Sequence, residues 1–307
     1  MILPHFTVLI FGEILWDVFG AEAKIGGAPF NFGAHLARLG EPAALVTAVG
    51  RDDLGDQALE LAQREGLRTD LVRRSPLPTG RCQVTLESGV PRYDLLEPVA
   101  YDDIRLRPEE LEALRNRPPR ALYFGSLGQR GETSRRTLKC LLDAGGYEEV
   151  FCDINIRPPF YTKEVLELCL SRCTILKISR EEAGILQEAG LLSSSSGEAA
   201  GEEGLCQALA RGYGNLKLVL VTLDKDGAMA YNTANGRFLY SAKPRSKPVS
   251  AVGAGDSFAA CFLFHYLRGA PLETCLDKGV RLSDYVVTRL GAVPEMPEAL
   301  LRSIQGR

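Results

Sequence analysis

Short apolar segments alternate with helical patterns along most of this 307-residue chain, and this alternation constrains the fold more than any other feature of the sequence. Extended apolar runs are predicted at residues 7–11, 43–49, 121–124, 150–153, 174–178 and 218–222. Helices are predicted at residues 32–39, 56–64, 109–115, 133–142, 165–173, 259–267 and 275–287. Such an alternation is typical of a mostly parallel sheet covered by helices on both faces. Because neither a repeat nor a linker divides the chain, residues 1–307 are predicted to form a single α/β domain.

Two short extended runs, at residues 81–86 and 91–96, interrupt this alternation. Ser88-Gly89 between them is a turn signal. The runs are too short for another strand–helix unit, so they are predicted to form part of a small β lid over the binding site. About residues 14–25 and 81–105 are expected to contribute to this lid.

The composition argues against several classes of protein. A formal charge of −3 disfavours a nucleic-acid-binding protein, which would carry a basic face. No apolar run is long enough to span a membrane, and the apolar start at residues 8–11 is interpreted as a first strand and not as a signal peptide. The three histidines lie far apart in the sequence, which argues against a Ser/His triad or a histidine metal site. The eight cysteines are scattered, so we expect buried free thiols in a reducing cytosol, hence a cytoplasmic protein.

A glycine-rich loop, Gly253-Ala254-Gly255-Asp256, runs directly into an apolar segment of helical length. Residues with almost no side chain let backbone amides close on an anion, and a helix N-terminus adds positive potential at the same point. Asp256 is a carboxylate placed where an anion would bind, which suggests a base beside a phosphoryl group. A helix N-cap is the alternative, because aspartate often caps helices. The loop alone does not decide between the two.

Further polar residues follow the other predicted strands. Asp17 is interpreted either as a solvated turn residue or as an acceptor for sugar hydroxyls, and Gly26-Gly27 with Asn31 either as a hydroxyl-binding helix start or as a plain turn and cap. The strand at 150–153 continues into Asp153-Ile154-Asn155-Ile156-Arg157, whose polar side chains would alternate on one face. Glu182 opens a helix, where a carboxylate is favourable for capping alone.

Taken together, these motifs resemble the ribokinase-like, or PfkB, family of carbohydrate kinases from end to end. Gly26-Gly27-Ala28-Pro29-Phe30-Asn31 is similar to the first family signature, and Gly253-Ala254-Gly255-Asp256 to the second. The motifs between them lie in the family's order: Asp153 to Arg157, Lys177 with Glu181-Glu182, and Val221-Thr222 with Gly227-Ala228. Within the family, Gly12-Glu13-Ile14-Leu15 looks most like fructokinases. Five motifs in the family's order are far more specific than one GAGD sequence.

The resemblance implies a three-layer α/β/α sandwich with a β lid and an ATP-dependent, magnesium-dependent sugar kinase. It implies that Asp256 is the base and that the amides of Gly253, Ala254 and Gly255 form the anion hole. It implies that the sugar is bound by Asp17, Gly27, Asn31 and Arg157. It implies that the nucleotide is bound by Lys177, Thr222 and Gly227, and that Glu182 acts on Mg²⁺ through water. The expected partners are a sugar and ATP, with a homodimer through the lid and neither nucleic acid nor membrane.

Two functions from different classes agree with these residues. The first is a fructokinase-like enzyme, with ribokinase and 2-keto-3-deoxygluconate kinase as alternatives. The second is a sugar- or nucleotide-binding sensor without catalysis, which the intact Asp256 and Glu182 disfavour. Ser250-Ala251 departs from the family's usual Asp-Thr, which puts the family's monovalent-cation site in doubt. Asp224 replaces a frequent glycine, Ser179 a usual asparagine and Gly33 a usual alanine, and none of these changes removes the base or the anion hole.

Overall fold

A computed structural model describes residues 5–20, 22–87, 90–192, 201–242 and 246–306. The strands of its largest sheet follow the order β14-β13-β12-β11-β10-β9-β1-β4. The chain divides into two compact units, Met1–Leu122 with Leu127–Tyr147 and Tyr123–Ser126 with Glu148–Arg307. Each unit is described below by itself. The single domain expected from the sequence stays a prediction.

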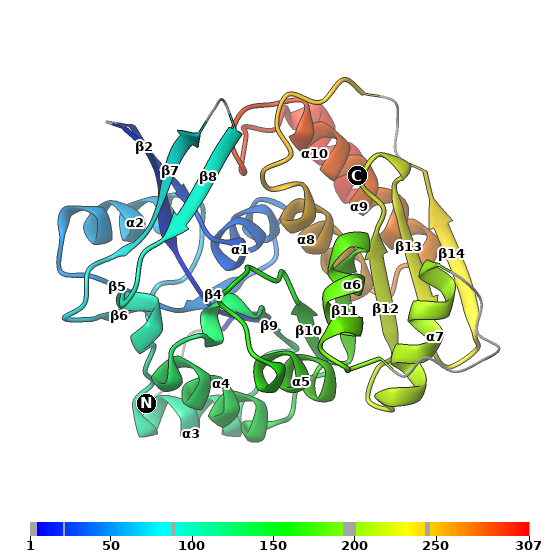
Figure 1. The fold of residues 1–307 in the computed structure, drawn as a ribbon, viewed down its shortest axis with the longest axis horizontal. Helices are drawn as coiled ribbons and strands as arrows, with labels where there is room; N and C mark the ends of the chain where they lie inside the picture. Colours follow the sequence, from blue (N-terminus) through cyan, green and yellow to red (C-terminus); the bar gives the residue numbers. More distant parts are fainter. Residues whose placement is uncertain (1–4, 21, 88–89, 193–200, 243–245, 307) are drawn as a thin grey trace. The chain divides into compact units, whose positions relative to one another are not determined.

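The first unit contains β1 (Val8–Phe11) paired in parallel with β4 (Ala43–Val46). Both strands are buried along their whole length, as expected for apolar strands covered on both faces. The remaining elements of this unit are helices α1 (Ala28–Arg38), α2 (Asp53–Arg64), α3 (Pro108–Asn116) and α4 (Glu132–Ala144), the short 3₁₀ segments at Ala100–Asp103 and Leu127–Gln129, and the small strands β5 (Ala48–Val49) and β6 (Arg73–Arg74). Figure 1 shows α1, α2 and the strands of this unit in blue to cyan.

A second sheet in the first unit has the order β3-β2-β7-β8. Its strands are β2 (Leu15–Phe19), β3 (Glu22–Gly26), β7 (Gly80–Glu87) and β8 (Val90–Leu95). These strands come from the two segments predicted to form the lid, and Figure 1 shows β7 and β8 as a long two-stranded arm. The predicted turn at Ser88-Gly89 lies outside the described residues. Whether this sheet closes over a ligand stays a prediction.

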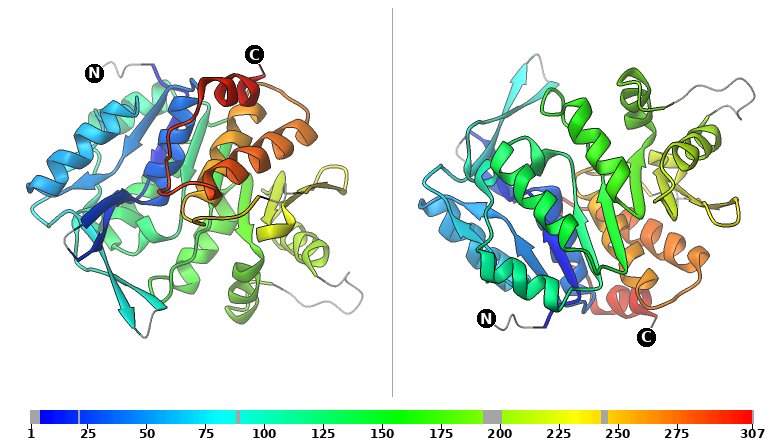
Figure 2. Two further views of the ribbon diagram at one scale, coloured as in Figure 1. Left: turned by 90° about the horizontal axis from the view of Figure 1, so that it is seen from above. Right: turned by 90° about the horizontal axis from the view of Figure 1, so that it is seen from below.

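The second unit contains β10 (Glu149–Asp153), β11 (Ile175–Ser179) and β12 (Leu218–Thr222), which pair in parallel, followed by the antiparallel strands β13 (Ala228–Asn232) and β14 (Arg237–Ser241). Asn235-Gly236, a dipeptide typical of hairpin turns, lies between β13 and β14. The helices of this unit are α5 (Lys163–Arg172), α6 (Arg180–Glu188), α7 (Glu202–Gly212), α8 (Ala254–Tyr266), α9 (Leu272–Val287) and α10 (Glu298–Gln305). Figure 2 shows α8 and α9 packed side by side in this unit. Strand β9 (Ala121–Phe124) contributes residues to both units.

Helix α8 is the central helix of the second unit. Its residues from Ser257 to His265 are all buried, and a helix that is apolar on every side belongs in a core. The rings of Phe258, Phe262 and Tyr266 follow one another along one side of the helix at 6.1 Å and 5.9 Å. This packing fixes the axis of α8, and therefore the direction in which its N-terminus points.

Four predictions of local structure were wrong. Asp17 does not lie in a turn after the first strand but within β2, paired with Lys24 of β3. Helix α1 begins at Ala28 and not near residue 32, because Pro29 is well placed in a first helical turn. Asn155 has a φ of 40°, so the alternation after Asp153 is broken: Asp153 is buried whereas Arg157 is exposed. The serine- and glycine-rich composition of residues 193–203 predicts a connection, but Glu202 and Glu203 belong to α7, and residues 193–200 lie outside the described residues.

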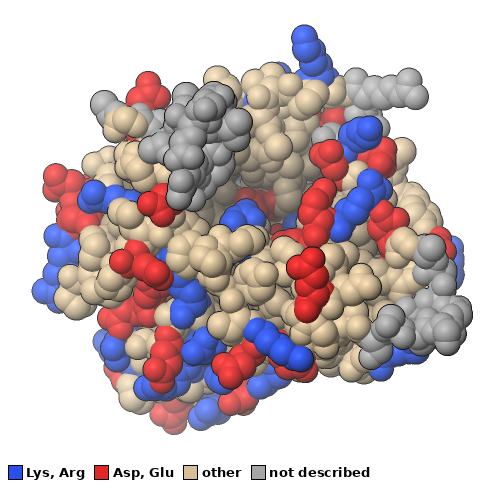
Figure 3. Space-filling model, in the orientation of Figure 1, with Lys and Arg blue, Asp and Glu red and all other residues tan. Residues whose placement is uncertain are grey.

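Charged side chains of both signs lie on the face shown in Figure 3. Acidic and basic residues alternate over that face without a large area of one sign. Several are paired along helices or between elements, such as Arg136 with Glu132 and Arg180 with Glu202. Among the described residues, no helix is long and apolar enough to cross a membrane.

Candidate active site

Three parallel strands of the second unit bring polar residues to one edge of the sheet. Asp153 at the end of β10 pairs in register with Lys177 of β11, and Ser179 at the end of β11 pairs with Thr222 at the end of β12. In open α/β sheets, ligands bind beyond the carboxyl ends of the strands. The register therefore explains why residues 24 and 43 positions apart in the sequence meet at this edge.

Lys177 and Asp153 form a buried ion pair. The Lys177 ammonium group lies 2.8 Å from each Asp153 carboxylate oxygen, and the two side chains are only 7% and 1% exposed. Burial alone would lower the pKa of Lys177, but the charges of Asp153, Glu182 and Asp256 outweigh it and hold that pKa above its usual value. The folded protein therefore favours the charged form of Lys177.

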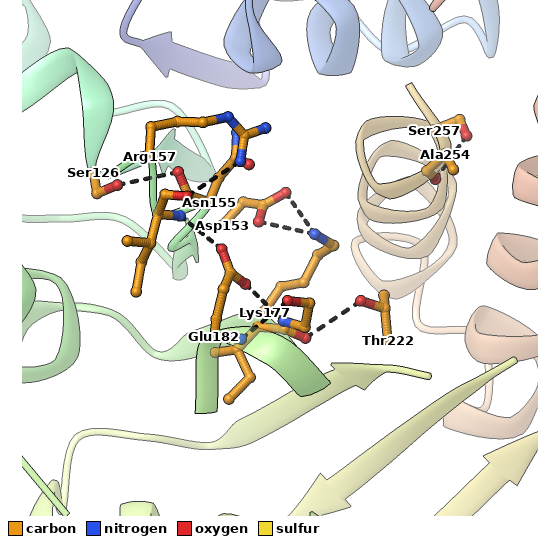
Figure 4. Close-up of polar contacts among 12 residues, drawn as sticks. Ser126, Asp153, Asn155, Arg157, Lys177, Glu182, Thr222, Ala254 and Ser257 are labelled. Carbon is orange, nitrogen blue, oxygen red and sulfur yellow. Dashed lines mark hydrogen bonds and ion pairs between the residues drawn. The ribbon is translucent and has the colours of Figure 1, made fainter. Parts of the chain in front are cut away.

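Glu182 connects two loops at the same edge. One of its carboxylate oxygens accepts the Ile156 amide at 2.6 Å, and the other accepts the Ser179 amide at 2.7 Å. The Ser179 hydroxyl in turn accepts the Glu182 amide, which completes a capping box at the start of α6. Burial raises the pKa of Glu182, the Lys177 charge lowers it, and the net direction is upward. Capping is thus an observed role of Glu182, as the sequence allowed (Figure 4).

The glycine-rich loop forms the start of α8. Gly253 is the N-cap residue, with a φ of 80°, and Asp256 lies within the first turn. The N-cap interpretation of Asp256 was therefore wrong. The Ala254 amide donates to the Ala251 carbonyl at 3.3 Å, whereas in the described chain the Gly255 amide has no acceptor, as is usual for a first helical turn. This turn can offer backbone donors to an anion beside a carboxylate.

Lys177 lies directly against this turn. A Cβ atom at Gly255 would lie 3.1 Å from the Lys177 Nζ, so only glycine leaves room for the ammonium group without a shift. Figure 4 shows the Lys177 amino group between Asp153 and α8, with Thr222 near the end of the neighbouring strand. The structure thus brings together Asp153, Lys177, Glu182 and the 253–256 loop.

Thr222 and Gly227 flank a short turn in the same unit. Thr222 ends β12, and the carbonyl of Gly227, a residue with a φ of 103°, accepts a hydrogen bond from the Leu223 amide. Asp224 between them has a φ of 53° and is exposed, so its carboxylate faces solvent. Arg157 is exposed, and its guanidinium donates to the Ile156 carbonyl at 3.2 Å.

An exposed apolar surface adjoins the 253–256 loop. The amides of Val249 and Ser250 both donate to the Val287 carbonyl, and a Cβ atom at Gly253 would lie 2.4 Å from the Ala292 carbonyl oxygen, so residues 249–253 and 287–292 lie side by side. Val249, Val252 and Leu290 on these segments are 59%, 49% and 73% exposed. Exposed apolar residues beside the start of α8 are suited to contact with the planar apolar ring of a ligand.

Three of the four residues predicted to bind the sugar, Asp17, Gly27 and Asn31, lie in the first unit, whereas Arg157 lies in the second. Gly27 has a φ of 103°, and a Cβ there would lie 2.6 Å from the Glu13 carbonyl oxygen, which explains why glycine is needed. Asn31 lies in the first turn of α1 and is buried. The half-buried Asp17 places a carboxylate oxygen 3.0 Å from the Cβ position of Gly26, so its side chain faces the segment that leads into α1.

Two polar residues were not among the predicted site residues. Asp153 belongs to a motif named in the sequence analysis but was given no role, although its position at the end of a predicted strand was a usable signal. Glu13 is buried and accepts the Ala28 amide at 3.3 Å, so it positions the start of α1. Sequence spacing gave no sign of this contact.

The carboxylates of Asp153 and Glu182 suit a magnesium ion that is bound mainly through water and not directly by the protein. Among the described residues, no three His, Cys, Asp or Glu side chains are grouped as a metal cage. Both oxygens of Glu182 already accept amides, and both oxygens of Asp153 face Lys177. Mg²⁺ keeps several waters and often binds through few carboxylates and substrate phosphates. The donors present therefore fit an ion held mainly by water and nucleotide.

Solved structures define the class of fold. A 2-dehydro-3-deoxygluconokinase from Thermotoga maritima has a TM-score of 0.81 to this chain at 22% identity, covering 99% of this chain and 100% of that one. A fructokinase with bound ATP from Xylella fastidiosa has a TM-score of 0.80 at 22% identity, covering 97% of each chain. The fold is thus the ribokinase-like α/β fold with a large, mostly parallel sheet, as predicted.

Sequence comparison gives the family. The pfkB family carbohydrate kinase profile matches residues 5–299. Probable fructokinase-4 of Arabidopsis thaliana is 27% identical over 314 aligned residues, 96% of this chain and 91% of that protein. An ATP-dependent 6-phosphofructokinase of Thermoanaerobacterium thermosaccharolyticum is 26% identical and covers 95% and 91% of the two chains. The chain belongs to the pfkB family of carbohydrate kinases, so it is a phosphotransferase that uses ATP to phosphorylate a sugar hydroxyl.

Proposed function

We propose that this protein is a fructokinase that transfers the γ-phosphoryl group of ATP to a hydroxyl of D-fructose. The observation that carries the proposal is the placement of Asp256 in the first turn of α8, beside the donors of Gly253 and Gly255. A carboxylate there would repel a bound anion, so its presence is explained best by a role in the reaction. A base beside a phosphoryl group would deprotonate the attacking hydroxyl. Fructose is the proposed acceptor because fructokinases are prominent among the relatives and solved structures of similar fold.

The proposed nucleotide site lies in the second unit. Val249, Val252 and Leu290 would contact the adenine, and the turn of Thr222 to Gly227 would border the phosphates. We propose that Mg²⁺ is held by nucleotide oxygens and waters, with Glu182 as the protein carboxylate that contacts those waters. When bound, the ion would neutralise charge on the phosphates. Direct contact of Lys177 or Arg157 with a ligand stays a prediction.

The proposed sugar site lies in the first unit. Asp17 and Asn31 offer a carboxylate and an amide, which together can accept from and donate to hydroxyls. The close approach of Gly27 to Glu13 allows the backbone to pass beside a ligand without a side chain between them. A homodimer through the β3-β2-β7-β8 sheet stays a prediction. In the part of the chain that the structure describes, the cysteines form no disulfide, which supports a reducing cytoplasm as the proposed location.

A substrate panel tests this function. ADP formation from ATP and Mg²⁺ is measured with D-fructose, ribose, 2-keto-3-deoxygluconate and fructose 6-phosphate, and without acceptor. We expect the highest kcat/KM with fructose. A higher kcat/KM with another sugar would replace fructose as the acceptor, and ADP formation with none of them, despite ATP binding, would support a non-catalytic sensor.

A further inference from the structure

A fixed positive charge lies against the first turn of α8. Lysine side chains are flexible in water, but Lys177 is buried and bound to both Asp153 oxygens at 2.8 Å. Its Nζ would lie only 3.1 Å from a Cβ at residue 255. Asp153 is itself the last residue of β10, in register with Lys177 of β11, so two strands of the sheet hold the ammonium group in place.

This arrangement is unfavourable for the helix alone. The N-terminus of α8 carries positive potential from its unpaired amides, so a nearby cation raises the free energy of the folded protein. Asp153, Glu182 and Asp256 all act on Lys177 and compensate for its charge. An anionic phosphoryl group at the same turn would gain from both the helix and Lys177. The helix terminus and Lys177 therefore provide positive potential at the same place.

We propose that Lys177 is a positioning residue for phosphoryl transfer: Asp153 holds its ammonium group against Gly255, where it fixes the α8 turn that carries Asp256. The proposal rests on the proposed function, because it assigns Asp256 as the base. It differs from direct nucleotide binding by Lys177, in which the amino group would turn from Asp153 to a phosphate. Fixing a turn matters because a displacement of about 1 Å at a reacting group can cost roughly 100-fold in rate.

The test uses a variant that removes both charges together. Lys177→Met alone leaves the Asp153 carboxylate buried without its cation and can prevent folding. Asp153→Asn with Lys177→Met is neutral and keeps side chains of similar size. Lys217→Met is the matched control, because Lys217 pairs with Glu149 at 2.9 Å in the same unit but precedes the start of β12. Circular dichroism is used to check that both variants fold.

Kinetics and nucleotide affinity are then measured with ATP, Mg²⁺ and saturating sugar. We expect the double variant to lose about 10- to 100-fold in kcat. Its Kd for ADP in titration calorimetry should stay within about threefold of the wild-type value, whereas Lys217→Met should change neither quantity. Weaker ADP binding with unchanged kcat would make Lys177 a nucleotide ligand and overturn the proposal. No change in either would assign the ion pair to stability alone and also overturn it.

Hydrogen exchange separates this proposal from the proposed function. We expect residues 254–260 to exchange faster in the double variant than in the wild-type protein or in Lys217→Met, with or without a sugar. If the wild-type protein phosphorylates no sugar, the proposed function fails, and unchanged exchange at residues 254–260 would independently overturn the positioning role. Faster exchange with full kcat would contradict the link between this turn and catalysis.

Discussion

At the scale of single residues, Gly253 and Gly255 are needed for different reasons. Gly253 has a φ of 80° and lies against the Ala292 backbone, so both its conformation and its surroundings require glycine. Gly255 is helical and needs only the absence of a side chain, because Lys177 occupies that space. The sequence motif is the same for both, but the physical constraints are not.

Gly253→Ala tests the first of these constraints. The left-handed conformation costs an alanine about 1–2 kcal/mol, and its Cβ would lie 2.4 Å from the Ala292 carbonyl oxygen. Gly269→Ala is the matched control, since Gly269 has a φ of 71° and no atom within 4 Å of its Cβ position. We expect urea unfolding to show a larger loss of stability for Gly253→Ala than for Gly269→Ala. Equal losses would mean that the contact with Ala292 has no cost.

Asp17→Ala tests the assignment of the sugar site. A hydrogen bond to a charged group contributes about 1.5–3 kcal/mol, so we expect the KM for the sugar to rise at least about tenfold. Asp17 and the predicted nucleotide residues belong to separate units, so the KM for ATP should change little. Initial-rate kinetics with each substrate varied in turn provide the measurement. An equal rise in both KM values would contradict the assignment.

At the scale of elements, His265 connects α8 with the C-terminal helix α10. Its Nε2 donates to the Ile304 carbonyl at 2.9 Å, because a carbonyl oxygen can only accept. Burial lowers the pKa of His265 below its ordinary value of 6.5, with Lys278 and Arg268 acting in the same direction and the Ile304 contact opposing them. The folded protein therefore favours the neutral ring.

This pKa shift predicts a loss of stability in mild acid. The contribution of the neutral His265 ring to the free energy of unfolding is fully present above pH 6.5, because the folded and the unfolded protein then both carry a neutral ring. As the pH falls from 6.5 towards the lower folded-state pKa, the unfolded chain binds the proton first, so the free energy of unfolding decreases. His265→Gln keeps a donor for Ile304 and should lose this dependence. The free energy of unfolding in urea is measured between pH 5 and 7.5 for both proteins. If it depends on pH in the same way for the wild-type protein and for His265→Gln, the prediction is wrong.

The β3-β2-β7-β8 sheet is predicted to move when the sugar binds. If it closes over the sugar, the amides at residues 81–87 should exchange more slowly when the sugar is bound, because closure excludes water. Hydrogen exchange is measured with and without saturating fructose, and the β12–β13 pair serves as an internal reference within the second unit. Unchanged exchange at residues 81–87 would count against closure.

The order of strands and helices could be predicted from the sequence because apolar runs and helical patterns report burial directly. Buried β1, β4 and β12 were all predicted within one or two residues at most ends. The turn interpretation of Asp17 was wrong because β2 is a short strand with a mixed sequence pattern. The break after Asp153 was missed because the positive φ of Asn155 follows from tertiary contacts, such as the Ser126 hydroxyl bonded to its carbonyl.

At the scale of the whole molecule, two compact units carry different parts of the proposed site. The first contains Asp17, Gly27 and Asn31, and the second contains Asp153, Lys177 and Asp256. The motifs identified the residues and their family, because each motif is local in sequence. The Asp153–Lys177 pair required the structure, since it depends on the register between β10 and β11.

The most direct measurement is γ-phosphoryl transfer from ATP to D-fructose by the wild-type protein and by Asp256→Asn. General-base catalysis contributes about 10²- to 10⁴-fold in rate, so we expect kcat to fall by at least that order. Asparagine keeps the size of the side chain, so the affinities for ATP and fructose should stay close to those of the wild-type protein. A variant that retains most of its kcat would contradict the assignment of Asp256 as the base.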